Sequence, residues 1–345
     1  MSVSLPSNAN IGHLKNNSGI LLITNGAHAI KRLEAANVPG SKVEWLEALH
    51  EGPVPLTKTR QKLRRIRSRH FESLGWTSFD GAMSGFEKRE RALQEPEKYN
   101  ELQLWFEHDL YDQLQLIELL DYLSERPDWL GKTRLVQFDQ FLGRVDLTVL
   151  SEGTQKLLPV TARQIAIARQ AWSTFRQPHP QALSALLAED TAALPFLKSA
   201  MLRLCQEFPD VGSGLGRTER QILQIVSKGE RSPGDLFRES QALEAVMFMG
   251  DSSFYMIVDR LIKSAEPLLS LNRSDEFLLT SRVGYTDAFR DQRLTITEMG
   301  RKVLRGEADR LDGLLSAYWI GGCAIKDRGA PRWWEDRKTF VSEDS

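Results

Sequence analysis

The stretch LQLWFEHDLYDQLQLIELLDYLSERP, residues 102–127, decides the fold because it places a strand and a helix in direct succession. LQLWF is an apolar, aromatic run typical of a buried strand. The segment that follows it, from Glu107, continues with helical spacing of its leucines. A buried strand that passes straight into a helix is the repeating unit of a parallel α/β sheet.

The same alternation of strand and helix extends outward on both sides of this stretch. GILLITNG (19–26) reads as a strand, and AHAIKRLEAANVPG (27–40) reads as a helix that Pro39-Gly40 stops. Further strands are predicted within SKVEWLEAL (41–49) and RLVQF (134–138). We therefore expect a mostly parallel, Rossmann-like sheet in an α/β domain over residues 19–155, with a charged helical insertion at 56–100.

The rest of the chain divides into a helical part and a part with mixed elements. We expect a flexible, polar leader at 1–18, an all-helical connector at 156–214 with Thr161 as a helix N-cap, and a tail at 323–345. Residues 215–322 follow the order of a winged helix, with three helices and then strands at LLSLN and FLLTSR. Thr218 and Gln221 have the spacing of a capping box for its first helix.

The composition of the chain excludes several classes of function. The chain has 345 residues, 45 Lys+Arg and 46 Asp+Glu, so its net charge of -1 argues against a protein that coats nucleic acid or an anionic membrane. Its apolar runs are too short for a membrane span, so we expect no membrane partner. Two cysteines, Cys205 and Cys323, are too few for a disulfide framework and favour a cytoplasmic location.

Polar residues follow each predicted strand, at the edge of a parallel sheet where ligands bind. They are Thr24, Asn25 and Gly26 after the first strand, His50 and Glu51 after the second, Glu107, His108 and Asp109 after the third, and Asp139 after the fourth. We expect Asn25, His50, Glu51, Glu107 and Asp139 to line one cleft.

The densest of these groups is Glu107-His108-Asp109. Two carboxylates and an imidazole suit a divalent metal site or general acid–base catalysis. Glu107 and Asp109 would face the same way at the strand end and are the candidate metal ligands, whereas His108 would face away. Glu107 and His108 are also candidate catalytic groups. The alternative is structural, with Asp109 as the N-cap of the next helix and Asp112 in its first turn.

LHEGPVP, residues 49–55, supplies the other candidate catalytic pair, His50 and Glu51. Gly52-Pro53 turns the chain at once and fixes the loop that carries them. The alternative is a loop pair satisfied by backbone and by a nearby cation. Asn25-Gly26 is a candidate cofactor contact, because backbone N–H groups before a helix bind phosphate. An ordinary turn is the alternative there.

The run KTRQKLRRIRSR, residues 58–69, contains seven Lys or Arg and no acid. Such a cationic helix face could bind the phosphates of RNA, DNA or a nucleotide. The alternatives are a solvated face or a partner for segment 101–155, which has 4 basic and 11 acidic residues. The residues of this candidate patch are Arg60, Lys62, Arg64, Arg65, Arg67 and Arg69.

Several motifs together resemble a bacterial family known by a domain of unknown function, the eighteen-thirty-five type. They are LHEGPVP, LWFEHDLYDQLQL, LPFLKSAMLRLCQEFP, GLGRTERQIL, FMGDSSFY and LTITEMGRKVLRGEADR, within residues 18–322. The resemblance implies a cytosolic α/β domain followed by helices and a winged-helix-like end. It implies no reaction. The chain departs from the family pattern at Ala27, where an acidic residue is expected.

These observations favour an enzyme or ligand-binding protein that acts on a phosphorylated or nucleotide-like molecule at the carboxyl edge of the sheet, with a divalent metal as the candidate cofactor. One alternative is a ligand-responsive regulator that binds DNA through the third helix of the winged-helix part. The 15 basic and 16 acidic residues of segment 216–322 disfavour DNA as a partner. A protein-interaction scaffold is the third alternative. The oligomeric state stays open.

Overall fold

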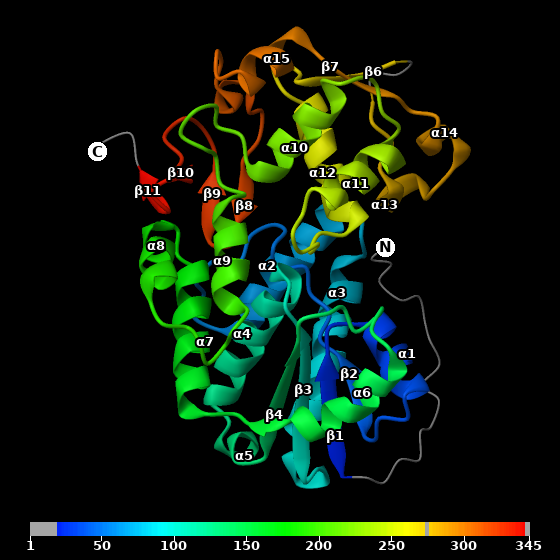
Figure 1. Cartoon of the computed structure of the whole chain (residues 1–345), viewed down its shortest axis with the longest axis vertical. Coiled ribbons are helices and arrows are strands. Elements are labelled where there is room, and N and C mark those ends of the chain that lie inside the picture. Colours follow the sequence, from blue (N-terminus) through cyan, green and yellow to red (C-terminus); the bar gives the residue numbers. More distant parts are fainter. Residues whose placement is uncertain (1–18, 273–275, 342–345) are drawn as a thin grey trace.

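A five-stranded sheet lies at the centre of the N-terminal half of the computed structural model, which describes residues 19–272 and 276–341 (Figure 1). The strand order is β2-β1-β3-β4-β5, with parallel pairing except for the antiparallel β5. The prediction of a mostly parallel α/β sheet is confirmed. The expected leader 1–18 lies outside the described residues. The strands are β1 Ile20–Thr24, β2 Ser41–Glu44, β3 Glu101–Glu107, β4 Thr133–Phe138 and β5 Leu158–Pro159.

Both faces of the sheet are covered, because alternate residues of each strand point to opposite sides. Leu21 and Ile23 of β1 belong to the core that also contains the buried leucines of α4, Leu110–Ser124. Leu22 belongs to a second apolar cluster with residues of α1, Ala27–Ala35, and α6, Leu147–Gly153. Since β1, β3 and β4 are apolar on both faces, they occupy the middle of the sheet.

Helix α4 is buried on nearly every side. It follows β3 directly, packs on the sheet, and contacts α7, Ala162–Phe175, and α9, Leu197–Cys205. Its buried residues therefore include polar ones, among them Asp112 and Glu118. The remaining helices of this region are α5 Pro127–Leu130 and α8 Gln181–Ala188. Thr161 is the N-cap of α7, as the sequence predicts, and it also forms a capping box with Gln164.

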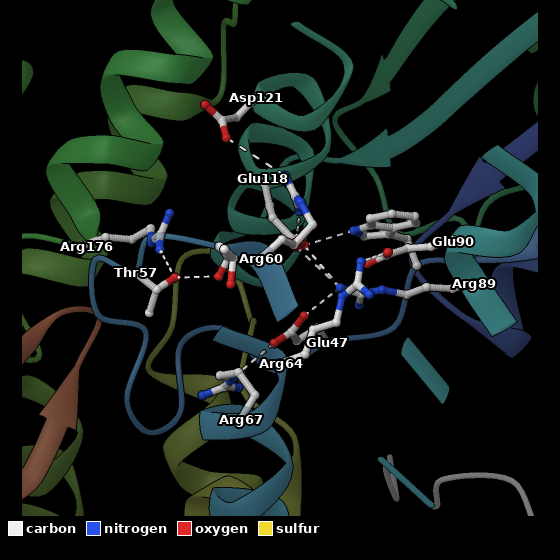
Figure 2. Close-up of polar contacts among 12 residues, drawn as sticks. Glu47, Thr57, Arg60, Arg64, Arg67, Arg89, Glu90, Glu118, Asp121 and Arg176 are labelled. Atoms are coloured by element: carbon white, nitrogen blue, oxygen red, sulfur yellow. Dashed lines mark hydrogen bonds and ion pairs between the residues drawn. The ribbon is translucent and has the colours of Figure 1, made fainter. Parts of the chain in front are cut away.

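The charged insertion folds as α2, Arg60–Ser73, and α3, Phe79–Arg91, followed by 3-10 turns at Ala92–Gln94 and Pro96–Lys98. Its arginines enter a buried ion network with carboxylates of the sheet domain (Figure 2). Glu47 accepts from Arg67 Nε at 2.9 Å and from Arg89 Nη2 at 2.7 Å. Glu118 of α4 accepts from Arg60 Nη1 at 3.0 Å and from Arg89.

Arg67 also holds the LHEGPVP loop in place. Its guanidinium donates to the carbonyl oxygens of Ala48, at 2.7 Å, and of Glu51. Gly52 turns the chain with φ +74°, a conformation that favours glycine, and a Cβ there would lie 2.0 Å from the His70 ring. The sequence attributes the defined conformation of this loop to Gly52-Pro53. In the structure, a buried arginine of the insertion also holds the loop through its carbonyl oxygens.

The C-terminal part begins with three helices, α10 Arg217–Val226, α11 Pro233–Ala242 and α12 Asp251–Ile262. An antiparallel hairpin of β6, Leu269–Leu271, and β7, Leu294–Ile296, follows, and then α15, Glu298–Leu304. Short helices α13 Thr280–Val283 and α14 Asp287–Arg290 and a 3-10 turn at Arg310–Gly313 complete it. Two more antiparallel hairpins end the chain, β8 Tyr318–Ile320 with β9 Cys323–Ile325, and β10 Arg332–Trp334 with β11 Thr339–Val341.

Two local predictions in this part are wrong. FLLTSR is not a strand, because its apolar residues anchor a loop: the Phe277 ring packs against Tyr255, and α13 begins at Thr280. The first helix does not begin with Thr218 as its cap. Gly216 is the N-cap and Glu219 the third residue, since the Thr218 hydroxyl donates to Glu207 instead.

Residues of the sheet, the connector and the C-terminal part share one continuous apolar core, which runs from Leu21 to Phe340. None of the described helices has both the length and the apolar character needed to cross a bilayer.

The ion network predicts a difference between two cations of α2. Arg67→Met leaves Glu47 buried with one partner fewer and releases the loop carbonyls, so the free energy of unfolding should fall by about 3–5 kcal/mol. Lys62→Met on the exposed side of the same helix should change it by less than about 0.5 kcal/mol. Urea unfolding measures both values, and equal effects would contradict the structural role of Arg67.

Glu118 predicts a loss of stability in acid. Burial raises the pKa of this carboxyl, but Arg89 and Arg60 outweigh burial and hold the pKa below its usual value. The network therefore contributes stability above about pH 4.3, the unfolded value, and loses it as the pH falls through the lower folded value. Urea unfolding between pH 6 and pH 3 should show a shallower loss for Glu118→Gln than for the exposed control Glu125→Gln. If the free energy of unfolding fell equally with pH in both variants, the contribution of Glu118 to acid sensitivity would be refuted.

Candidate functional site

A cavity of about 910 Å³ lies between the carboxyl edge of the sheet and helices α11 and α12. The strands point their carboxyl ends toward these helices (Figure 1). Its sheet side includes Asn25, His50 and Glu107, and its other side is formed by residues between Phe237 and Ser253. The size lies within the range of pockets that enclose a small organic ligand.

The cavity lies where the strand order reverses. Strand β1 pairs with β2 on one side and with β3 on the other, so the connections after β1 and β3 leave in different directions. Open α/β sheets bind ligands in the crevice at such a point. Asn25-Gly26 follows β1 and Glu107-His108-Asp109 follows β3, which explains why these two segments meet.

Three buried carboxylates meet at the junction of β3 and α4. Glu107, Asp109 and Asp112 each offer an oxygen, and these oxygens lie within 4.8 Å of one another. Their exposed fractions are 5%, 4% and 0%. All three residues line the cavity. Sequence reasoning assigned Asp112 only to the helix start, so the structure adds it to the predicted pair.

Hydrogen bonds hold these carboxylates in fixed orientations. Asp112 accepts from Asn25 Nδ2 at 2.7 Å and from the Glu107 backbone N–H at 2.5 Å. Glu107 accepts from the Leu142 N–H at 2.7 Å. Asp109 accepts from the Asp112 N–H at 3.2 Å and so caps α4, as predicted. The capping role and a place in the cluster are therefore compatible.

Charge at this cluster is poorly compensated. Among the described residues, no Lys, Arg or His forms an ion pair with any of the three carboxylates, in contrast to Glu118 on the same helix. Burial raises the pKa of Glu107 to about 7, against the hydrogen bond from Leu142. Burial and then the charge of Glu107 raise the pKa of Asp109 and of Asp112 well above their usual range.

Groups that attract an anion lie near the carboxylates. Gly26 is the N-cap of α1, and within residues 19–272 and 276–341 no side chain caps the first-turn N–H groups of this helix. Gly26, Ala27 and His28 line the cavity, together with the exposed residues Arg144 and Arg238. Arg238 forms an ion pair with Asp235 at 2.6 Å. Helix N-termini and arginines are the usual contacts of a phosphate group.

His50 lines the cavity, and its ring packs edge-on against Tyr111 at 5.9 Å and Phe248 at 5.4 Å between centroids. Burial lowers its pKa to about 4, and Arg67 and Arg203 act in the same direction against Glu51. His50 is therefore a neutral imidazole at pH 7, with one nitrogen that donates and one that accepts.

Three predicted site residues do not line the cavity. Oε1 of Glu51 lies 3.5 Å from Nε2 of His70. Burial raises the pKa of Glu51, but the interaction with His70 outweighs burial and lowers it. The His108 ring packs against Phe141 and Phe196. Asp139 is exposed at the end of β4. Of the five residues expected in one cleft, the structure brings together Asn25, His50 and Glu107.

The predicted basic patch does not reach the cavity. Arg60, Arg64 and Arg67 form ion pairs with Glu118, Glu90 and Glu47. Lys62, Arg65 and Arg69 are exposed on α2, away from the cavity lining. The interpretation of this run as a partner for acidic residues of the same chain is confirmed for Arg60, which pairs with α4.

Sequence reasoning missed the wall that α11, α12 and the segment between them contribute. Met247 and Phe248 belong to it, as do Trp76 from the insertion and Arg144 after β4. The signal available was FMGDSSFY, since five of its residues line the cavity: Phe248, Met249, Gly250, Ser252 and Ser253.

No family model matches the chain, and no curated protein matches it. Among solved structures, the chain is similar to the DNA-binding, cleavage and re-ligation domain of Plasmodium falciparum topoisomerase II, with 10% sequence identity and a TM-score of 0.44. The match covers 86% of this chain and 51% of that one, so the chain spans about half of that structure. A likeness at this level carries no conclusion about activity.

Repulsion within the cluster predicts a stabilising substitution. Glu107→Gln keeps a carbonyl oxygen for the Leu142 N–H and places an amide donor beside Asp109 and Asp112. In chelator-treated protein it should raise the free energy of unfolding by about 1–2 kcal/mol. Glu44→Gln, which alters a half-buried residue lining the same cavity outside the cluster, is the control. Urea unfolding tests both, and a destabilised Glu107→Gln would contradict the charge argument.

Proposed function

We propose that this chain is a cytoplasmic protein that binds a divalent cation through Glu107, Asp109 and Asp112 and acts on the phosphate of a ligand in the cavity. The observation that carries the proposal is the cluster itself, three buried carboxylates that line one cavity without an ion-paired cation among the described residues. The location is supported by two buried, free cysteines.

A divalent cation would remove the cost of this arrangement. Carboxylates taken out of water are unfavourable unless a positive charge compensates them. An all-oxygen donor set suits Mg²⁺, Mn²⁺ or Ca²⁺ better than softer metals. The bonds from Asn25 and from two backbone N–H groups fix the carboxylates in advance, so little freedom is lost when the cation binds.

The phosphate specificity is supported by the other groups that line the cavity. The uncapped N-terminus of α1 and the exposed side chain of Arg144 would contact phosphate oxygens that the cation does not neutralise, whereas Arg238 would have to leave its ion pair with Asp235 to do so. Such a cation would stabilise the negative charge on the phosphoryl oxygens and lower the pKa of a bound water. The reaction class that this set of groups favours is hydrolysis or transfer of a phosphate group.

The C-terminal part, which we propose to be a winged-helix domain, would then form a wall of the ligand site and not a DNA surface. Its third helix, α12, offers no free cations for phosphates. Arg260 lies 4.0 Å above the Tyr318 ring and pairs with Glu219, and Lys263 pairs with Asp259. Two serines at the start of α12 instead line the cavity.

Calorimetric titration with Mn²⁺ and Mg²⁺ tests the proposal. The chelator-treated protein should bind at one site and gain about 2.7 kcal/mol of unfolding free energy at a cation concentration one hundred times the dissociation constant. Glu107→Gln and Asp112→Asn should weaken binding at least about tenfold, which corresponds to about 1.4 kcal/mol. Asp139→Asn, at the end of the neighbouring strand, should bind as the unaltered chain does.

Absence of any saturable heat with either cation in the folded protein would overturn the proposal. Equal weakening by Asp139→Asn would show a general effect of acidic charge, and it would also count against a site at these three residues.

A further inference from the structure

The part of the cavity beyond the carboxylates is apolar and aromatic. Helix α11 contributes Phe237, the segment before α12 contributes Met247, Phe248 and Met249, and the insertion contributes Trp76. None of these side chains would contact a cation or a phosphate. A ligand that consists of phosphate alone would leave this wall in contact with water, so the wall indicates an attached organic group.

Three residues that line the cavity, His50, Trp76 and Tyr111, carry buried polar atoms without partners in the part of the chain that the structure describes, which a ligand would reach by a small turn of these side chains. Among the described residues, neither ring nitrogen of His50 has a hydrogen-bond partner, and neither does the indole Nε1 of Trp76. The Tyr111 hydroxyl lies near the Gln115 amide but outside hydrogen-bonding geometry. Unpaired polar groups in a buried place cost about 1–3 kcal/mol each, so a bound group that pairs with them would be strongly favoured.

These side chains connect the carboxylates to the apolar wall. Tyr111 lies in the first turn of α4, between Asp109 and Asp112 in the sequence. The His50 ring packs edge-on against both Tyr111 and Phe248, with ring centroids 5.9 Å and 5.4 Å apart. A ligand with its phosphate at the carboxylates would therefore extend past Tyr111 and His50 toward Phe248.

We infer that the organic group is a nucleobase, so that the ligand of this site is a nucleotide whose ring edge is read by His50 and Trp76. The inference rests on the proposed cation and phosphate site. A flat ring with donors and acceptors on its edge satisfies the unpaired nitrogens while its faces pack on Phe248 and the methionines. An aliphatic chain would fill the same wall but leave these nitrogens unpaired.

The two ring nitrogens of His50 are suited to hydrogen bonding with the edge of a nucleobase. Because burial keeps the pKa of His50 near 4, the imidazole is neutral and presents both a donor and an acceptor. Trp76 presents only a donor, which requires an acceptor on the ring. Its own ring is fixed by stacking on Phe71, with centroids 5.6 Å apart and planes at 20°.

Calorimetry in saturating Mn²⁺ tests the inference with defined probes. They are inorganic pyrophosphate, hexyl diphosphate, and the diphosphates of adenosine, guanosine, cytidine and uridine. At least one nucleoside diphosphate should bind about tenfold or more tightly than both pyrophosphate and hexyl diphosphate. His50→Phe keeps an aromatic ring but no nitrogen and should reduce this preference about tenfold, as should Trp76→Phe. Trp334→Phe in the C-terminal hairpin is the matched control and should keep the full preference.

Each other result has a distinct meaning. Nucleoside diphosphates that bind no better than pyrophosphate, with Mn²⁺ still bound, overturn the base inference and leave the cation site standing. Hexyl diphosphate as the tightest probe also overturns it, in favour of an aliphatic ligand. Preference retained in both His50→Phe and Trp76→Phe removes these residues as readers of the base. Failure of the unaltered chain to bind Mn²⁺ overturns the proposed function first.

Discussion

Burial of α4 on nearly every side is the constraint on which this molecule depends. Most residues of this helix are shielded from water, with Asp121 half-buried near its end, so a charged side chain on its buried faces is costly unless it is compensated inside the protein. Glu118 is compensated by arginines of the insertion and by the Trp45 indole N–H at 2.9 Å. Asp112, on the same helix, has only neutral donors. This contrast between the two ends of one helix is the basis for the cation site that we propose at Asp112.

The insertion acts on the site from a distance. Arg67 is fully buried, and its bonds to the carbonyls at Ala48 and Glu51 fix the segment from which His50 enters the cavity. Arg89 joins Glu47 beside that segment to Glu118 on α4. The two walls that carry His50 and the carboxylates are therefore connected by ion pairs, and their separation depends on the arginines of α2 and α3.

Local patterns in the sequence were sufficient for the sheet and for one half of the site. The apolar runs at Ile20–Thr24 and Glu101–Glu107 are long enough to identify the central strands, and polar residues at their ends mark the ligand edge. The two-residue strand β5 has no pattern that could reveal it. Arg67 and Lys62 are both cations in the same basic run, and the sequence does not show which of them is buried. The packing of α2 against the LHEGPVP loop buries Arg67 and leaves Lys62 exposed. The wall at Phe237 and Phe248 depends on contact between distant parts of the chain, which periodicity does not encode.

The apolar wall has a consequence for the order in which the protein is made. The carboxylates and His50 lie in the first half of the chain, whereas the segment from Phe237 to Ser253 is synthesised much later. Because the apolar core is continuous from Leu21 to Phe340, the wall and the carboxylates belong to one packed unit. A product truncated before Phe237 would contain the three carboxylates but lack the residues that form the opposite wall of the cavity.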